Sequence, residues 1–289
     1  MSQQVIGVIG GSGLYDIEGL QNVETVQLDT PFGAPSDAYV TGTLAGRKLV
    51  FLPRHGRGHK LLPSELNFRA NIWGFVKLGV RWLISVSAVG SMREEIAPGH
   101  MVMVDQFYDR TKSRASSFFG DGIVGHVPFG DPICADLSGL LYDGAVALGL
   151  TAHKGGTYIC IEGPQFSTRA ESNIYRSWGV DVIGMTNIPE AKLAREAGLC
   201  YATIAMATDY DCWHDGHDDV SVETVMKTLQ DNVDNARRLI AHVAETFPAE
   251  LDCRYSGTTR AAIMTAPENW PADARARLAL LLGEEGTQA

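Results

Sequence analysis

The sequence predicts an α/β protein, a single domain with a largely mixed or parallel central β-sheet surrounded by helices. Short apolar runs that are typical of buried strands alternate with segments whose apolar residues recur at helical spacing. No internal repeat and no low-complexity linker divides the 289 residues. Nearly every chemically interesting side chain directly follows a predicted strand, where sheets of this kind bind their ligands. We therefore expect one domain spanning residues 1–289, with a less regular segment from about residue 250.

The overall charge points to a small-molecule partner. The formal net charge is -10 at pH 7, and 45% of the residues are hydrophobic, as in an ordinary soluble domain with a real core. An acidic protein without a basic cluster large enough to offset phosphate repulsion is a poor binder of nucleic acids or anionic membranes. We expect neither partner.

The cysteines indicate a reducing compartment, and the hydropathy gives no sign of a membrane span. Five scattered cysteines form no C-x-x-C pair, so neither a disulfide framework nor a metal site is expected. No apolar run reaches the roughly 18 residues of a membrane span, and the N-terminus shows no secretion signal. We expect a cytoplasmic protein.

A glycine-rich turn at residues 10–13 follows the first predicted strand, residues 5–9. Its backbone amides can approach a ligand closely, and the hydroxyl of Ser12 adds a donor that suits a phosphate. A dinucleotide-binding fingerprint would need a third glycine at position 16, where the chain has Asp16.

The second predicted strand, residues 48–53, leads into the densest cationic stretch of the chain, residues 54–60. Arg54 offers a bidentate donor and His55 a second donor, and neighbouring glycines leave room for an anion. A solvated basic loop would explain the same residues. Apolar residues at helical spacing predict a core-packing helix over residues 66–77.

The middle of the chain contains further predicted strands that are followed by small or polar residues. A strand at residues 82–86 ends in the small residues 87–91, which either bind an anion or simply pack tightly. A strand at 101–104 precedes a long segment, 105–132, that contains His126 and is expected to be functional or to contact a partner subunit. A helix at 138–148 and a strand at 157–161 follow.

Two further strand ends carry polar residues. In residues 162–171, Thr168 and Glu171 form a capping box at a helix start, which leaves Phe166 and Ser167 unexplained. A strand at 180–183 ends in residues 184–186, and a helix is expected over 189–197.

Two aspartates follow the most apolar strand, residues 201–207. If the chain stays extended, Asp209 and Asp211 point the same way, and burial raises the pKa of at least one carboxyl. From these residues alone, a solvated turn or a helix N-cap is the favoured interpretation. A long amphipathic helix over 222–243 and a short helical patch over 273–282 complete the prediction.

Taken in order, these segments resemble the 5'-methylthioadenosine phosphorylases of the trimeric purine nucleoside phosphorylase family. The matching stretches extend from about residue 5 to 245: IGGSGL at 9–14, DTPFGAPS at 29–36, RHGR at 54–57, GSMREE at 90–95, DQF at 105–107, IEGPQFSTRAES at 161–172, MT at 185–186 with PE at 189–190, and AMATDYDCW at 205–213. Gly184 stands where an Asn can precede the Met–Thr pair, and the residues after about 250 match the family pattern poorly.

The resemblance implies a nucleoside phosphorylase-like fold and a transferase of the pentosyltransferase class. The implied reaction is phosphate-dependent cleavage of 5'-methylthioadenosine to adenine and 5-methylthioribose 1-phosphate, in purine and methionine salvage. It also implies a homotrimer that needs no metal or organic cofactor, with inorganic phosphate as co-substrate.

The resemblance also assigns site residues. Phosphate would be held by Ser12, Arg54, His55, Ser87, Thr186 and the backbone of Ala88. The ribose would lie against Met185, and the base pocket would be formed by Phe166, Ser167, Asp209 and Asp211. The thiomethyl group would meet Val222 and Val225, with His126 reaching in from a neighbouring subunit.

The chemistry of the aspartates agrees with this assignment. A purine leaves as a neutral base only if its N7 is protonated, and its exocyclic amine needs an ionised acceptor. Two neighbouring carboxyls with separated pKa values meet both needs, so we expect Asp209 as the acid and Asp211 as the amine acceptor. The alternatives are a purine nucleoside or 5'-methylthioinosine phosphorylase, and a nucleoside-binding protein without activity.

Overall fold

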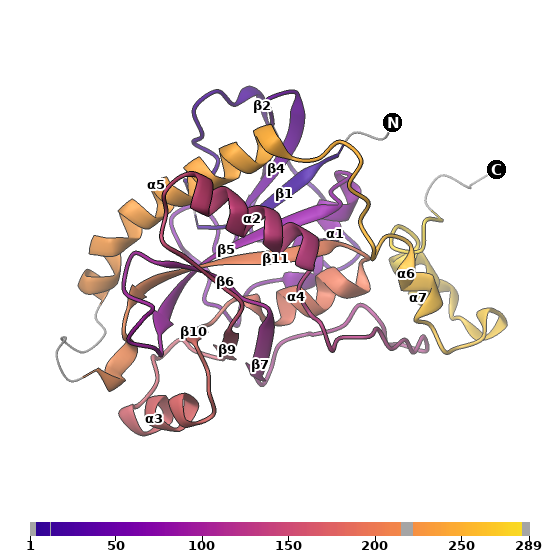
Figure 1. The fold of residues 1–289 in the computed structure, drawn as a ribbon. Helices are drawn as coiled ribbons and strands as arrows, with labels where there is room; N and C mark the ends of the chain where they lie inside the picture. The colour runs from indigo at the N-terminus through magenta and orange to yellow at the C-terminus, as the bar shows by residue number, and fades with distance from the viewer. Residues whose placement is uncertain (1–3, 12, 215–221, 285–289) are drawn as a thin grey trace.

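The computed structural model describes residues 4–11, 13–214 and 222–284 (Figure 1). Its centre is a mixed sheet in which eight strands follow the order β2-β3-β4-β1-β5-β10-β9-β7, while β11, β6 and β8 branch from β5. The strands are β1 (Ile6–Gly10), β2 (Gln21–Val26), β3 (Tyr39–Leu44), β4 (Arg47–Pro53), β5 (Trp82–Ser91), β6 (Met101–Met103), β7 (Gln106–Arg110), β8 (Ala152–Lys154), β9 (Thr157–Ile161), β10 (Val182–Gly184) and β11 (Cys200–Asp209). The predicted fold class, with a mixed sheet and surrounding helices, is confirmed.

Strand β5 is the branch point of the sheet. It pairs in parallel with β1 up to Ser85, and its last residues, Gly90 and Ser91, pair with β10 in the antiparallel direction. Along its other edge it pairs in parallel with β11 from residue 82 to residue 90. Between residues 85 and 90, the edge of β5 that faces β1 and β10 therefore has no partner among the described strands, because β1 and β10 diverge there. We call this gap between β1 and β10 the fork, and the candidate site lies at it.

Helices cover the sheet. The helix α5 (Val222–Thr246) lies against β11 together with α2 (Ala135–Ala147), and α4 (Asn187–Glu196) packs with α1 (Phe68–Lys77) on the other side (Figure 1). The helix α3 (Arg169–Ser177) begins with the predicted capping box, because Thr168 Oγ1 accepts from the Glu171 amide and the Glu171 carboxylate accepts from the Thr168 amide. These five helices agree with predicted ones to within a few residues.

The C-terminal segment extends to one side of the sheet (Figure 1). It contains the short helices α6 (Thr258–Ala261) and α7 (Ala272–Leu278), and two single turns of 3-10 helix lie at Asp211–Trp213 and Pro267–Asn269. The backbone of residues 124–126 pairs with residues 262–264 in this segment. The segment is therefore attached to the long stretch that precedes α2.

Four strands were missed by the sequence analysis. Every residue from 21 to 25 in β2 is exposed, so this edge strand lacks the apolar alternation that identifies strands. The strand β3 has the sequence YVTGTL, in which threonines and a glycine interrupt the apolar residues, and β8 has only three residues. The strand β7 lies inside residues 105–132, which were read as a continuous irregular segment, and four of its five side chains are exposed.

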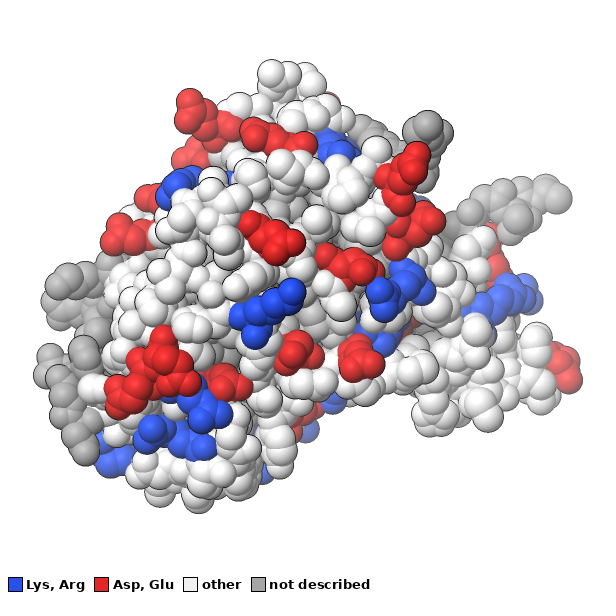
Figure 2. Space-filling model, in the orientation of Figure 1, with Lys and Arg blue, Asp and Glu red and all other residues white. Residues whose placement is uncertain are grey.

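The distribution of charged and apolar residues is informative about possible partners. On the face in Figure 2, acidic side chains are widely spread, and the basic ones lie in small groups beside them, with the most extensive group at the lower left. No helix in the described ranges is long and apolar enough to cross a membrane. All five cysteines are free thiols.

Candidate active site

The fork at β5 opens into a cavity of about 240 Å³. It is lined by residues at the ends of β5, β9, β10 and β11 and in the turn after β4, as expected for a sheet that binds ligands beyond its strand ends. Its lining residues are His55, His59, Pro63, Ala88, Val89, Gly90, Ile161, Phe166, Ser167, Ile183, Gly184, Met185, Thr186, Thr208, Asp209 and Asp211. Eight of the predicted site residues therefore line one cavity.

One end of the cavity is made by the two aspartates, although not in the predicted way. The chain does not stay extended after β11, because Asp211 adopts a left-handed backbone conformation with φ +52° and begins a single helical turn. The Asp211 amide donates to Asp209 Oδ1 at 2.8 Å, and Asp211 Oδ2 accepts from Ser172 Oγ at 2.5 Å. Both carboxyls are nearly buried, so the interpretation as a solvated turn is wrong.

Burial raises the pKa of both carboxyls. For Asp209 this effect outweighs the opposing hydrogen bonds from Thr208 and from the Asp211 amide. For Asp211, burial and the nearby Asp209 charge together outweigh the hydrogen bond from Ser172. A proton on Asp209 is therefore held more tightly than in an exposed aspartate.

The contacts of the Thr208 hydroxyl are compatible with a protonated Asp209. Thr208 Oγ1 lies 2.7 Å from Asp209 Oδ2 and 3.2 Å from the carbonyl oxygen of Val89. Its single hydrogen cannot be donated to both acceptors. If Asp209 Oδ2 carries a proton, the carboxyl donates to Thr208 and Thr208 donates to Val89, so every partner is satisfied.

Gly90 makes the aspartate end possible. A Cβ atom at this position would lie 3.0 Å from Asp209 Oδ1 and 3.4 Å from the Cβ of Asp211. Contacts this short would push the carboxyls out of their positions. The glycine at the end of β5 therefore leaves the space that the aspartate pair occupies.

The opposite end of the cavity presents hydroxyl groups. Ser87 Oγ and Thr186 Oγ1, both buried, lie 3.1 Å apart although 99 residues separate them in the chain. The fork brings them together, because Ser87 lies on the stretch of β5 between its pairings with β1 and β10, and Thr186 directly follows β10. Of the two, Thr186 lines the cavity. Ala88 lines the cavity beside them. Neutral donors that are held together in this way suit an anion.

His55 is neutral in this site. Its Nδ1 lies 2.9 Å from the carbonyl oxygen of Leu61, which can only accept, so Nδ1 carries the ring hydrogen. Burial, helped by the neighbouring Arg54 charge, lowers the pKa of His55 to about 4. The remaining ring nitrogen, Nε2, therefore offers a lone pair. A phosphate oxygen that meets it must carry a hydrogen.

Arg54 lies behind the cavity and not in its lining. Its guanidinium forms a two-point ion pair with Glu190, at 2.8 and 3.0 Å, and donates to Ser85 Oγ and to the carbonyls of Ile9 and Val86. It thus joins the end of β1 and the middle of β5 to α4. Direct contact of Arg54 with phosphate stays a prediction.

The segment before α3 covers the cavity between these ends. Phe166 is half exposed at the rim. Ser167 Oγ is buried and has no hydrogen-bond partner among the described residues, which makes it a free polar group facing the cavity. Met185 lies in the lining next to Thr186. These three residues are where the sequence predicted the base and the sugar.

Four predicted residues remain outside this geometry. Ser12 lies outside the described residues, and α5 begins at Val222 with the side chains of Val222 and Val225 also outside them. His126 is exposed, and its amide donates to the carbonyl oxygen of Ala262 in the C-terminal segment. Its side chain is not in the cavity of its own chain.

Several polar residues of the site were missed by the sequence analysis. Thr208 and Ser172 support the aspartates, Tyr158 contacts Ser87, and Glu190 pairs with Arg54. The segments TDYD and PE stand out as motifs in the sequence, but the partners of Asp211 and Glu190 lie far away in the chain, on α3 and in the turn after β4. A single sequence carries no signal for such pairs.

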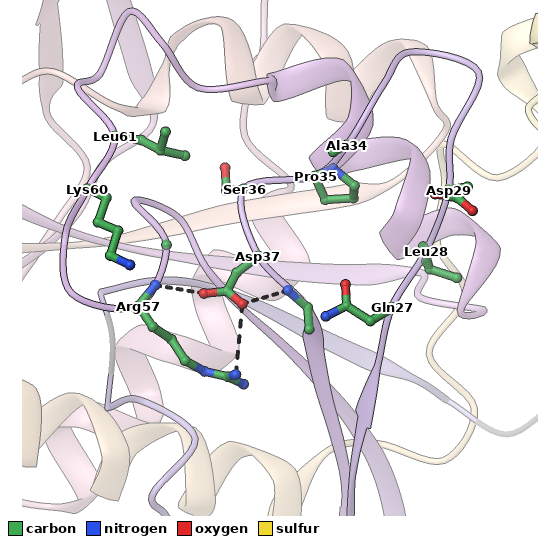
Figure 3. A pocket seen from close by; sticks show the side chains of 12 residues that line it. Gln27, Leu28, Asp29, Ala34, Pro35, Ser36, Asp37, Arg57, Lys60 and Leu61 are labelled. Carbon is green, nitrogen blue, oxygen red and sulfur yellow. Dashed lines mark hydrogen bonds and ion pairs between the residues drawn. The ribbon is translucent and has the colours of Figure 1, made fainter.

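A second cavity, of about 540 Å³, lies on the other side of the turn at residues 54–61 (Figure 3). Asp37 is at its centre, accepts from the backbone amides of Ala38 and Arg57, and lies 3.9 Å from the exposed Arg57 guanidinium. Lys60 and Asp29 lie at its margins. Although this cavity is larger, its polar groups bond to one another or face solvent. The smaller cavity is therefore the better candidate for chemistry.

The described residues contain no group of three His, Cys, Asp or Glu side chains placed to hold a metal ion. The chemistry available in the cavity is therefore that of two buried carboxyls, a set of hydroxyls and a neutral imidazole. Such groups can hold an anion at one end and move a proton at the other.

Comparison with known proteins agrees with this arrangement. Residues 5–245 match the family described as the phosphorylase superfamily, so the chain belongs to that superfamily. A relative from Geobacter sulfurreducens named S-methyl-5'-thioadenosine phosphorylase is 61% identical over 97% of this chain and 99% of its own length. A relative of the same name from Koribacter versatilis is 56% identical over 98% of this chain and 97% of its own length.

Solved structures extend the comparison. A methylthioadenosine phosphorylase from an antarctic soil metagenomic library is 46% identical, with a TM-score of 0.91 over 98% of this chain and all of the other. The methylthioadenosine phosphorylase of Schistosoma mansoni in complex with adenine is 34% identical, with a TM-score of 0.83 over 98% of this chain and 99% of the other. Within the superfamily, the chain thus groups with the methylthioadenosine phosphorylases. The relatives also match the segment after residue 250, contrary to the expectation from sequence.

Proposed function

We propose that this protein cleaves 5'-methylthioadenosine with inorganic phosphate, giving adenine and 5-methylthioribose 1-phosphate. The observation that carries the proposal is the cavity at the β5 fork, which has hydroxyl donors at one end and two buried carboxyls at the other. Relatives with 61% and 56% identity carry the name of this activity. The reaction transfers the thioribosyl group from adenine to phosphate.

At the carboxyl end, Asp209 is proposed to release the base. In its protonated form the Asp209 carboxyl, which lies 2.7 Å from the Thr208 hydroxyl through Oδ2, would pass its proton to N7 of the departing adenine, which then leaves neutral. Asp211 is proposed to accept from the exocyclic amine, and the unpartnered hydroxyl of Ser167 would bond to the base. A carboxylate facing C6 favours an amine over a carbonyl oxygen, so adenine is preferred to hypoxanthine.

At the hydroxyl end, Ser87, Thr186 and the Ala88 amide are proposed to hold phosphate, together with Ser12 and Arg54 as the resemblance implies. The neutral Nε2 of His55 would accept from a P–OH group, so phosphate would bind with one hydrogen directed at this residue. Orientation of the anion against the anomeric carbon supplies the main catalytic advantage of this end. Met185 would pack against the sugar, and Val222 and Val225 against the thiomethyl group.

The proposal is tested by measuring the release of adenine from 5'-methylthioadenosine with and without phosphate. We expect adenine and the sugar phosphate in equal amounts, only when phosphate is present, and slower release of hypoxanthine from 5'-methylthioinosine. Release of adenine without phosphate would identify a hydrolase instead. Binding of adenine without any turnover would identify a nucleoside-binding protein.

We further propose a homotrimer in which His126 of each chain reaches the cavity of a neighbour. The support is the family resemblance and the exposed apolar side chains on and beside α3, namely Ile174 and Trp178, with Tyr108 in contact with Trp178. A trimer in light scattering, together with a higher KM for 5'-methylthioadenosine in His126→Ala, would support this assembly. A fully active monomer would contradict it.

The remaining expectations are proposed on the same basis. The reaction would need no metal and no organic cofactor, because a neutral leaving base and an oriented anion make the glycosidic bond labile without either. Unchanged activity after dialysis against a chelator would support this. A cytoplasmic location, in purine and methionine salvage, fits five free thiols and would be checked by fractionation of cells that express the protein.

A further inference from the structure

We propose that Tyr158 is a positioning residue for the phosphate end of the cavity, and that Gly184 is needed because the Tyr158 hydroxyl occupies the space beside it. This inference rests on the proposed function, because it concerns how the same site holds its anion. Tyr158 lies on β9 and Gly184 ends β10, the neighbouring strand.

The Tyr158 hydroxyl lies directly behind the two hydroxyls of the phosphate end. Tyr158 Oη is 3.2 Å from Ser87 Oγ, and Ser87 Oγ is 3.1 Å from Thr186 Oγ1. The Tyr158 side chain is fully buried and its ring packs edge-on against Phe107. The three hydroxyls therefore form a chain from Tyr158 through Ser87 to Thr186, and Thr186 lines the cavity.

The number of hydroxyl hydrogens available to Ser87, Thr186 and Tyr158 defines the role of Tyr158. When Ser87 and Thr186 both donate to a bound anion, no hydrogen remains between two oxygens that are 3.1 Å apart. The hydrogen of Tyr158 can then be donated to one of these oxygens from behind. Burial raises the pKa of the Tyr158 phenol, so the group keeps this hydrogen. Tyr158 thereby leaves both front hydroxyls free to donate to phosphate.

Gly184 is coupled to this arrangement. A Cβ atom on Gly184 would lie 2.0 Å from Tyr158 Oη and 2.6 Å from Tyr158 Cζ. Distances this short are impossible for non-bonded atoms, so any larger residue at 184 must displace the phenol. The two positions therefore act as one unit, in which the missing side chain of Gly184 makes room for the hydroxyl of Tyr158.

The decisive variant is Tyr158→Phe, which keeps the ring and removes only the hydroxyl. We expect the KM for phosphate to rise about three- to tenfold, the effect of one net hydrogen bond, while the KM for 5'-methylthioadenosine changes less than about twofold. Tyr142→Phe, on α2, is the matched control and should change neither value. An unchanged KM for phosphate, or an equal rise in both KM values, would overturn the proposal.

Two double variants test the coupling. In a Ser87→Ala background, Tyr158→Phe should change the KM for phosphate less than it does in the wild type, because the oxygen that accepts its hydrogen is gone. Gly184→Ala should weaken phosphate binding in the wild type but have little further effect in Tyr158→Leu, where no ring remains to be displaced. Additive effects in both pairs would contradict the proposed unit.

A binding measurement separates this inference from the proposed function. Inorganic phosphate alone should raise the midpoint of thermal unfolding of the wild type, and the same shift should need a higher phosphate concentration in Tyr158→Phe. If the wild type binds phosphate but does not cleave 5'-methylthioadenosine, the proposed function fails and the role of Tyr158 is still decided. Equal shifts in wild type and variant would overturn the role of Tyr158.

Discussion

The two ends of the cavity use opposite kinds of polar group. The aspartate end has two carboxyls whose pKa values are raised by burial, whereas the front of the other end has the hydroxyls of Ser87 and Thr186, which do not titrate in the working pH range. The first end can hold and release a proton, and the second can donate to an anion without changing its own charge. Substitutions at the two ends should therefore affect different kinetic constants.

The largest expected effect is at the aspartate end. Asp209→Asn removes the proton that the base receives, so we expect kcat to fall by about 10²- to 10⁴-fold while both KM values change little. The Asn amide can still donate to Thr208, so the fold should persist. Steady-state kinetics with both substrates checks this. A kcat within twofold of the wild type would exclude Asp209 as the acid.

Asp211→Asn should change selectivity for the base. An Asn can present an amide donor to a 6-oxopurine, whereas the carboxylate favours the amine, so the preference for adenine over hypoxanthine nucleosides should fall about tenfold or more. The ratio of the two kcat/KM values measures this. Equal losses for both nucleosides would mean that Asp211 supports the site without reading the base.

Thr186→Val should affect the phosphate end alone. It keeps the shape of the side chain and removes one donor, so the KM for phosphate should rise roughly tenfold while the KM for the nucleoside stays constant. If the nucleoside KM rose instead, the two ends would not be separate, and the comparison on which this account rests would fail.

The raised pKa of Asp209 also predicts how stability depends on pH. The folded protein holds this proton more tightly than the unfolded chain, so the free energy of unfolding falls as the pH rises from the unfolded to the folded pKa value. Asp211 contributes in the same direction. Asp209→Asn should therefore lose less stability than the wild type between acidic and neutral pH. Parallel stability profiles from denaturant titrations would show that folding does not raise the pKa of Asp209.

The smallest effect is expected in the second cavity. Arg57→Ala removes an exposed guanidinium 3.9 Å from Asp37 and keeps the backbone amide that Asp37 accepts from. Such a surface pair contributes less than about 1 kcal/mol, and the phosphate KM should change less than about twofold. A large loss of phosphate affinity would move the anion site toward this cavity.

Much of this arrangement could be predicted from the sequence, because strand ends are visible in a chain as apolar runs that stop at small or polar residues. Ser87, Thr186 and Asp209 stood out in this way as residues at strand ends, and the family resemblance added their roles and that of Ser167. In the structure Thr186, Asp209 and Ser167 line one cavity, and Ser87 lies 3.1 Å from Thr186. Edge strands such as β2 could not be found, since their exposed residues carry no apolar pattern.

Other features depend on contacts that one sequence does not encode. The left-handed turn at Asp211 reorients its carboxyl, and the long hydrogen-bonded links from Arg54 to Glu190 and from Tyr158 to Ser87 join residues more than 70 positions apart. Burial of Arg54 could not be inferred from its position in a cationic stretch. The residues that hold the lining residues in place are therefore harder to predict from the sequence than the lining residues themselves.

A crystal structure with adenine and phosphate bound tests the central claim most directly. The account predicts adenine within hydrogen-bond distance of Asp209 and Ser167, and phosphate within hydrogen-bond distance of Ser87 and Thr186, in the same cavity. Phosphate bound beside Arg57 and Lys60 in the second cavity, or adenine bound away from the aspartates, would contradict it.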